Sequence, residues 1–546
     1  MSTDDSPRLT RRTVLLGSTL AAGAAVLAAR TATATEPGTA FANGVASGDP
    51  LPDRVIIWTR ITPTPDATPG SGAGAPTRVR WEVATDPGFA AVVRAGAVTA
   101  TADTDHTVKV DVTGLAPATT YHYRFTAPDG QRSRPGRTRT APHVDADVAR
   151  LRFGVVSCSN WEAGYFAAYR HLAARDDLDA IVHLGDYLYE YGRGEYGARG
   201  GPVRLHDPAH EIVTLADYRI RHAQYKTDPD LQALHARQPF IVTWDDHETA
   251  DNAWRDGAEN HTPGLEGAWA RRYADGRRAY LEWMPLRVTR PDQPLYRRLR
   301  FGRLAELSML DLRSHRSEQV SAASAAVDAT DRTITGARQL DWLTAGIVTA
   351  PTRWRLVGNP VMIAPILLPP LDVRTTEALT RAVGVPRAGL SYNADQWDGY
   401  TSDRRRLFDA IAAAAAPNTV FLTGDIHSSW AAELPLDAAQ QPAGGTVGTE
   451  FVVPSVTSPN IDDLLGVPSR SASPAVEAAL RATNRHLRHV ELDSHGFGVF
   501  EVTADRAQMD WWYLTDPTDP AAGARVGASL AVADGSQRLS PATPLP

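Results

Sequence analysis

The stretch of sequence that decides the fold is Ala180-Ile181-Val182-His183-Leu184-Gly185-Asp186-Tyr187-Leu188-Tyr189, in which an apolar run ends in a Gly-Asp turn. A short apolar run bounded by a turn is typical of a buried strand. Four other segments follow the same pattern, an apolar run and then side chains that bind metals or phosphate: residues 153–160, 241–248, 355–360 and 420–427. Because loops at the ends of neighbouring strands converge, we expect these clusters to build one site.

The wider pattern divides the chain into two regions and a tail. Apolar strands alternate with helical patterns across residues 150–515, which predicts an α/β catalytic domain around layered sheets. Residues 41–145 contain short runs rich in β-branched and aromatic residues, such as 54–60, 79–83 and 120–125, so we expect an all-β sandwich that resembles a fibronectin type III domain. Residues 516–546 are rich in Pro, Ala, Gly and Ser, and we interpret them as a loosely ordered tail.

Composition excludes several classes of protein. The chain has 546 residues, 43% of them hydrophobic and 22% charged, which is typical of a globular protein with more than one core. The net charge is −7 and no long block of Lys or Arg is present, which argues against specific nucleic acid binding. Cys158 is the only cysteine, so the chain forms no intramolecular disulfide and relies on its core or on metal.

The first 34 residues have the order of an export signal. Arg11-Arg12 precedes an uncharged stretch over residues 14–29, and Ala32-Thr33-Ala34 provides a small-residue cleavage site. The paired arginines resemble a twin-arginine signal, which exports folded proteins, and the alternative is a general secretory signal with incidental arginines. The apolar stretch is short for a bilayer span. We therefore expect a secreted protein, exported by the twin-arginine machinery, whose mature chain has no transmembrane segment.

Each cluster also has a purely structural explanation. Gly-Asp is a common turn, and an Asp after a strand often caps the next helix. A single cysteine such as Cys158 is usually an inert buried thiol, Tyr189 could be a packed aromatic ring, and His247 could be a capping histidine. Asp, Asp-His and Asp-x-His all follow apolar strands directly, and this joint occurrence favours one metal site over separate structural roles.

Three motifs carry a resemblance to a known family. Gly185-Asp186-x-x-Tyr189, residues 245–248 (Asp-Asp-His-Glu) and residues 424–430 (Gly-Asp-x-His-Ser-Ser-Trp) closely resemble the PhoD-like alkaline phosphatase family. This family belongs to the calcineurin-like metallophosphoesterase superfamily and is related to the purple acid phosphatases. The resemblance extends from about residue 41 to about residue 513. It implies two metal centres at one end of a β-sandwich flanked by helices, with iron and calcium as the metals.

The resemblance also implies roles for individual residues. Asp186 would bridge two metals, with Cys158, Tyr189 and His427 on the side of Fe3+ and the harder carboxylates of Asp246 and Asp425 on the side of Ca2+. Asn359 matches a further ligand position, and Asp251 and Asn252 could serve an additional calcium ion. His247 would face the substrate and stabilise or protonate it, and Asn160 would donate a hydrogen bond to a phosphate oxygen.

The sequence thus predicts a secreted, metal-dependent phosphatase that hydrolyses phosphate esters by attack of a metal-bound hydroxide. One alternative is a phosphodiesterase or phospholipase D that acts on phospholipids, because insertions outside the motifs decide the substrate. A second alternative is a non-catalytic secreted binding protein whose site is degenerate. The complete set of candidate ligands argues against this second alternative.

Overall fold

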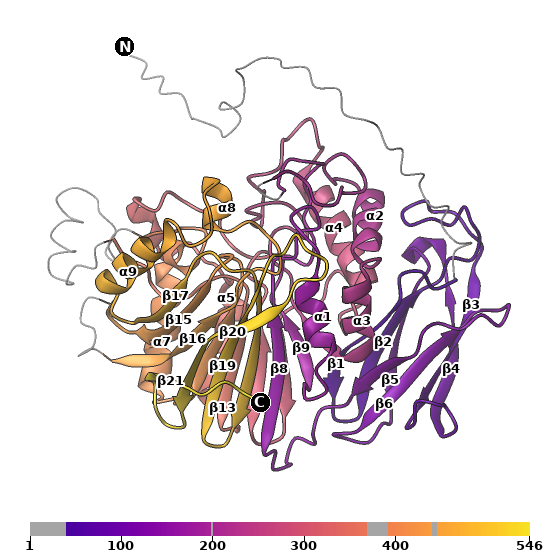
Figure 1. Cartoon of the computed structure of the whole chain (residues 1–546), viewed down its shortest axis with the longest axis horizontal. Coiled ribbons are helices and arrows are strands. Elements are labelled where there is room, and N and C mark those ends of the chain that lie inside the picture. Colours follow the sequence, from indigo (N-terminus) through magenta and orange to yellow (C-terminus); the bar gives the residue numbers. More distant parts are fainter. Residues whose placement is uncertain (1–39, 198–199, 369–390, 439–444) are drawn as a thin grey trace. The chain divides into compact units, whose positions relative to one another are not determined.

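The computed structural model describes residues 40–197, 200–368, 391–438 and 445–546, and the predicted signal peptide lies outside this range. Residues Gly38–Pro546 form one compact unit. Two large sheets pack face to face at its centre, and helices cover their outer faces (Figure 1).

The first large sheet combines strands from both ends of the chain. Its order is β21 (Leu539–Pro541), β20 (Ala524–Ala533), β19 (Arg506–Leu514), β18 (Gly496–Thr503), β8 (Arg150–Val156), β9 (Ala180–His183), β10 (Pro239–Val242), β1 (Val45–Leu51), β2 (Arg54–Arg60) and β5 (Thr107–Thr113). Strands β8, β9 and β10 are parallel neighbours. Their carboxyl ends therefore lie at the same edge.

The second large sheet faces the first. Its order is β11 (Arg297–Phe301), β12 (Ala305–Met309), β13 (Trp354–Asn359), β14 (Thr419–Thr423), β16 (Thr446–Val452), β15 (Ser429–Pro435) and β17 (Leu487–Glu491). Strands β12, β13 and β14 are parallel. The core between the two sheets contains Phe153 and Val182 from the first sheet and Leu356, Leu422 and Phe451 from the second. The apolar runs expected to be strands at the starts of segments 153–160, 180–189, 241–248, 355–360 and 420–427 are therefore confirmed as β8, β9, β10, β13 and β14.

Two groups of helices cover the outer faces of the sandwich. Against the first sheet pack α1 (Ala167–Ala173), α2 (Leu215–Tyr225), α3 (Pro229–Arg237) and α4 (Trp269–Trp283). Against the second pack α5 (Ala337–Thr349) and α7 (Thr401–Ala413), while α8 (Ile461–Leu465) and α9 (Ser473–Thr483) follow β16. Short 3-10 turns are η2 (Ala102–Thr104), η3 (Ala325–Asp328) and η4 (Trp397–Gly399). No helix in the described part of the chain has both the length and the apolar character needed to cross a membrane.

The N-terminal strands form the predicted β-sandwich, but it shares a sheet with the catalytic region. A small sheet of β4 (Val92–Ala100), β3 (Thr77–Ala84), β6 (Thr120–Thr126) and β7 (Gly136–Arg139) packs on β1, β2 and β5. Strand β1 also pairs in parallel with β10. A side chain at Gly48 would meet the backbone oxygen of Pro285 at 2.0 Å, so only glycine fits where β1 joins the catalytic sheet.

The prediction of a loosely ordered tail at 516–546 is wrong. Strand β20 pairs with β19 along its length, and β21 pairs with β20. Leu539 and Leu545 are buried, and the backbone N–H of Leu545 donates to Asp510 Oδ2 at 2.6 Å. Small residues with low strand propensity form these strands because β19 offers them an open sheet edge, so tertiary pairing overrides local preference.

Candidate metal centre

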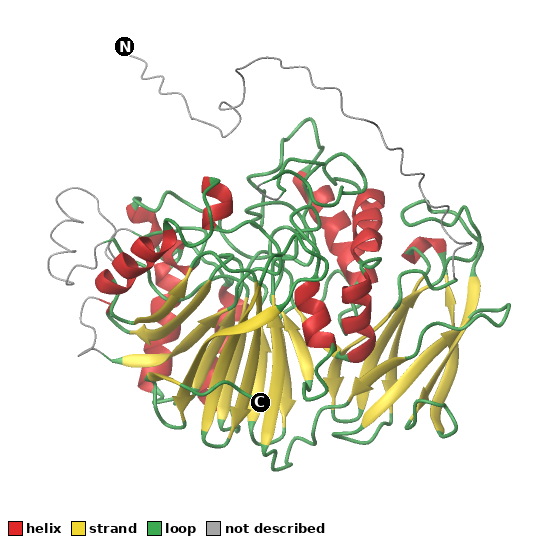
Figure 2. Ribbon diagram, in the orientation of Figure 1, coloured by secondary structure: helices red, strands yellow, loops and turns green. Residues whose placement is uncertain are grey.

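The loops that follow β8, β9, β10 and β14 meet at one end of the sandwich, where Figure 2 shows long loops gathered above the strands. Backbone hydrogen bonds tie the first two loops together. The N–H of Cys158 donates to the oxygen of Gly185 at 3.2 Å, and the N–H of Ser159 donates to the oxygen of Asp186 at 2.9 Å. Residues far apart in sequence are thus held side by side.

Four of the predicted ligands have a backbone conformation that side chains rarely adopt. Cys158, Asp186, Asp425 and His427 have φ angles of 59°, 54°, 67° and 54°. None of them is glycine, so each conformation carries a free-energy cost that the surrounding structure must offset. Strain of this kind concentrates at functional sites.

Cys158, Asp186 and His427 form the first group of candidate ligands. Their ligand atoms lie within 4.8 Å of one another. The Tyr189 hydroxyl donates to Asp186 Oδ2 at 3.1 Å and lies 3.2 Å from His427 Nε2. His427 Nδ1 donates to the Pro459 carbonyl at 2.8 Å, which leaves the Nε2 lone pair facing the group. Burial lowers the pKa of His427 to about 4, so the imidazole is in the neutral form that binds metals.

Asp186, Asp246 and His247 form a second group, whose ligand atoms also lie within 4.8 Å of one another. Asp186 belongs to both groups, which is the arrangement expected of a carboxylate between two cations. Its Oδ1 is buried and has no hydrogen-bond partner. A buried carboxylate oxygen without a partner is costly, and a cation would satisfy it.

Burial also acts on the charges of the first group and its neighbours. It raises the pKa of Asp186 well above its usual value, and burial together with the Asp186 charge does the same for the Cys158 thiol. Burial, followed by the charge of Asp395, raises the pKa of Asp425 to about 7. A nearby cation favours the ionised form of each group. The donor set of thiol, phenol, imidazole and carboxylates therefore fits metal ions.

Asp246 and Asp425 come from different sheets and meet at one arginine. Arg313 Nη2 lies 3.4 Å from Asp246 Oδ2 and 3.7 Å from Asp425 Oδ1. Asp246 Oδ2 also accepts from the backbone N–H of Asn252 at 2.7 Å, and Asp425 Oδ2 accepts from Gln396 Nε2 at 3.1 Å. The two carboxylates predicted to bind the harder ion are thus neighbours.

Comparison with known proteins identifies the family. The sequence model of the PhoD-like phosphatase family matches residues 153–511. The sequence model of the PhoD-like phosphatase N-terminal domain matches residues 26–142. The chain belongs to the PhoD-like phosphatase family. It is 35% identical over 503 residues to alkaline phosphatase D of Bacillus subtilis (strain 168), which covers 90% of this chain and 80% of that protein.

Solved structures agree with this assignment. A structure of PhoD superposes with a TM-score of 0.82 at 33% identity and covers 94% of either chain. GAP50, the anchor in the inner membrane complex of Plasmodium, matches with a TM-score of 0.31 at 10% identity, and the match covers 69% of this chain and 89% of that chain. The resemblance seen in the motifs is confirmed, and this PhoD-like phosphatase is a phosphoric ester hydrolase.

His247 of this PhoD-like phosphatase is held by a residue that the sequence analysis missed. Glu190 Oε2 lies 2.7 Å from His247 Nδ1, and Glu190 also accepts from the backbone N–H of Asp251 and from Asn260 Nδ2, each at 2.7 Å. Burial by itself would lower the pKa of His247, but the charges of Asp246, Glu190 and Asp186 raise it well above its usual value. The sequence offered one indication of this role, because Glu190 directly follows the predicted ligand Tyr189.

Glu248 has a structural task in the same PhoD-like motif. Its carboxylate accepts from the backbone N–H groups of Asp186 at 3.1 Å, Tyr187 at 2.8 Å and Asp245 at 2.8 Å. One buried side chain therefore fixes the loops after β9 and β10 relative to each other. This explains why a glutamate follows Asp-Asp-His without being a predicted ligand.

Other predicted residues lie close by but are engaged elsewhere. Asn359 donates to the Val361 carbonyl and accepts from Trp397 Nε1. Asn160 Nδ2 donates to the Tyr196 carbonyl at 2.6 Å. The remaining pair also has protein partners: Asp251 accepts from the hydroxyl of Tyr191, and Asn252 Nδ2 donates to Glu259. Of these four, Asp251 belongs to neither of the two groups of candidate ligands found among the described residues, and the three asparagine side chains bond to protein partners.

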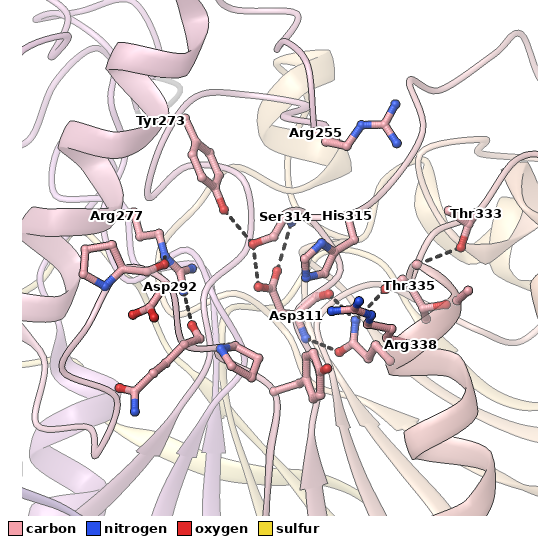
Figure 3. A pocket seen from close by; sticks show the side chains of 17 residues that line it. Arg255, Tyr273, Arg277, Asp292, Asp311, Ser314, His315, Thr333, Thr335 and Arg338 are labelled. Carbon is pink, nitrogen blue, oxygen red and sulfur yellow. Dashed lines mark hydrogen bonds between the residues drawn. The ribbon is translucent and has the colours of Figure 1, made fainter.

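A cavity of about 520 Å³ is lined by Asp311, Ser314 and His315, the sequence neighbours of Arg313 (Figure 3). Tyr273, Asp311 and Ser314 line it, and the Tyr273 hydroxyl donates to Ser314 Oγ at 2.8 Å. Asp311 Oδ1 accepts from Trp244 Nε1 at 3.0 Å. None of the predicted ligands is among its lining residues in the described part of this phosphatase. The cavity therefore lies beside residues that contact the loops of the metal centre, and not beside the candidate ligands themselves.

Proposed function

We propose that the protein is an exported, metal-dependent phosphoesterase that works with two metal ions on either side of Asp186. One observation carries the proposal: Asp186 belongs to both groups of candidate ligands, and its Oδ1 is buried without a hydrogen-bond partner. The name of the relative alkaline phosphatase D supports phosphate ester hydrolysis by this chain.

The donor types support different metals on the two sides. A thiolate from Cys158, a phenolate from Tyr189 and the neutral imidazole of His427 suit Fe3+, whereas the carboxylates of Asp246 and Asp425 suit Ca2+. Bound ions would neutralise the charge on the phosphoryl oxygens and supply a nucleophile at neutral pH. Asn359 stays outside this proposed set because its amide already has protein partners.

His247 is the proposed acid of the reaction. Glu190 holds its Nδ1, and the surrounding carboxylates keep the ring protonated. A protonated imidazole binds no metal, so Asp186 and Asp246 are the members of the second group that would hold an ion. An imidazolium beside the bridging carboxylate can bind a phosphoryl oxygen or donate a proton to the leaving oxygen. Asn160 holds the Tyr196 loop next to Tyr189 and His247, so we assign it the task of shaping the site wall.

The test of this function compares substrates on metal-loaded protein. Purified enzyme is given a phosphate monoester, a phosphate diester and a phospholipid side by side, before and after removal of metal with a chelator. Hydrolysis that stops on chelation and returns with metal supports the proposal, and the preferred substrate decides between phosphatase, phosphodiesterase and phospholipase. Full hydrolysis after complete removal of metal would contradict it. Export is tested by changing Arg11-Arg12 to Lys-Lys, which should leave the protein inside the cell.

A further inference from the structure

Arg313 is a buried cation that the proposed reaction does not use. It follows β12 in the loop whose Asp311, Ser314 and His315 line the cavity of Figure 3, and its side chain is 1% exposed. Its Nε and Nη2 bind both oxygens of Asp245, at 2.6 Å and 3.0 Å. Its Nη1 and Nη2 bind both oxygens of Asp395, at 3.1 Å and 3.0 Å. The guanidinium is therefore clamped from two sides.

The clamped guanidinium also reaches the two predicted ligands of the harder ion. Its Nη2 lies 3.4 Å from Asp246 and 3.7 Å from Asp425. Of the four carboxylates around the guanidinium, only Asp246 belongs to a group of candidate ligands in the described residues, and Asp425 is the other carboxylate predicted to bind the harder ion. Asp245 and Asp395 fix the arginine, and the arginine in turn faces the carboxylates that would bind metal. The planar fork of arginine suits this task, because it makes several directed contacts at once.

The loop backbone reinforces the position of Arg313. Asp311 Oδ1 lies 3.3 Å from the backbone N of Arg313 and accepts its N–H, and it also accepts the indole N–H of Trp244, the residue before Asp245. Gln339 of α5 donates to the Asp311 backbone oxygen at 2.7 Å. The side chain that touches Asp246 and Asp425 is thus held at both its backbone and its guanidinium end.

We propose that Arg313 is a positioning residue, which holds Asp246 and Asp425 together as ligands of the harder metal ion. The proposal rests on the proposed function, because it takes a metal at these two carboxylates as given. Four carboxylates in one buried region repel one another, and the guanidinium offsets part of that repulsion. Without it the carboxylates of Asp246 and Asp425 turn apart, and the ion is held less tightly.

The experiment replaces Arg313 with lysine, which keeps the charge but loses the fork. The matched control is Arg152→Lys. Arg152 is also buried, but its guanidinium pairs with Asp177 and Glu501, and it takes no part in the clamp around Asp246 and Asp425. Calcium chloride is titrated by calorimetry into calcium-depleted full-length protein. Iron content, visible absorption and melting temperature are measured on the same samples.

The expected result is a separation of the two metals. Arg313→Lys should bind calcium about ten- to a hundredfold more weakly, the usual effect of removing a partner that orients a metal ligand. Its iron content and spectrum should match wild type, and excess calcium should restore turnover. Arg152→Lys should keep wild-type calcium affinity. Equal calcium affinity in wild type and Arg313→Lys would overturn the proposal, as would equal loss of iron and calcium together with a lower melting temperature.

A second variant decides the question if Arg313→Lys does not fold. Asp395→Asn leaves the arginine in place but weakens one side of its clamp, so calcium affinity should fall severalfold with iron unchanged. Unchanged calcium affinity in Asp395→Asn would overturn the proposal. If folded wild-type protein binds no calcium, the proposed two-metal function is itself contradicted. That result differs from one in which wild type binds calcium and the Arg313 variant binds it equally well.

Discussion

Single residues of the centre differ in what they offer a metal, and Tyr189 is the most informative of them. Its hydroxyl touches both Asp186 and His427. We predict that Tyr189→Phe keeps the ring packing but weakens or shifts the visible absorption of the iron-loaded protein, because a phenolate ligand transfers charge to ferric iron. Cys158→Ser should change the spectrum and also lower iron retention.

The control for the tyrosine variant is Tyr191→Phe. Tyr191 donates to Asp251 and touches neither Asp186 nor His427 through its hydroxyl, so its loss should leave the spectrum unchanged. The measurement is the visible spectrum and iron content of all variants after identical preparation. If wild type, Tyr189→Phe and Cys158→Ser give identical spectra, neither residue is an iron ligand.

Residues that support ligands were the hardest to predict. Asp186, Asp246 and His427 were predicted because each directly follows an apolar strand. The contacts of Arg313 could not be predicted, because its partners Asp245 and Asp395 lie 68 and 82 residues away in the sequence. No local pattern records a contact across that distance. The same holds for Glu190, whose task depends on where His247 arrives in space.

At the scale of elements, the turn after β9 depends on one glycine. Gly185 has a φ of +115°, and a side chain there would lie 2.6 Å from Asp245 Cβ and 2.7 Å from its backbone N. We predict that Gly185→Ala lowers the free energy of unfolding by roughly 1–3 kcal/mol through the backbone alone. It should also lower metal content, because the shifted turn displaces Asp186.

The matched control is Gly72→Ala, where φ is +66° and no heavy atom lies within 4 Å of the added carbon. This change should cost roughly 1–2 kcal/mol and leave metal content unchanged. Denaturant unfolding and elemental analysis of both variants provide the check. Wild-type metal content in Gly185→Ala would show that the turn tolerates the shift and that Asp186 does not depend on it.

Elements were predicted well where burial alone decides them. The apolar strands of the catalytic region have partners on both sides, so composition and length identify them. Strands β20 and β21 were missed because Ala, Gly and Ser carry little strand signal, and their order comes from pairing with β19. The pairing of β1 with β10 was missed for a related reason, since nothing local to either strand specifies the other.

At the scale of the whole molecule, Lys226 links the N-terminal strands to the catalytic core. It is 1% exposed, and its Nζ donates to the Tyr187 hydroxyl at 2.9 Å and lies 4.9 Å from the Trp58 ring of β2. Burial lowers the pKa of Lys226 to about 7. The unfolded chain therefore binds one more proton between about pH 7 and pH 10. The cost of burying this charge is complete below pH 7 and vanishes above pH 10.

We predict that Lys226→Met is more stable than wild type at pH 7, by an amount on the order of a few kcal/mol, and that the gain shrinks as the pH rises toward 10. Comparing the two proteins cancels the contributions of other titrating groups. The check is denaturant unfolding of both proteins at several pH values from 6 to 10. If the difference in free energy of unfolding between the two proteins stays constant across this range, burial does not lower the pKa of Lys226.

The central claim is that Asp186 joins two metal ions in one centre. The most direct test is elemental analysis of wild type and Asp186→Ala, purified in the same way and measured beside their phosphatase activity. Because Asp186 belongs to both groups of candidate ligands, the variant should lose iron and calcium together and should lose activity. Wild-type protein that is fully active without either metal, or Asp186→Ala with unchanged metal content, would contradict the account.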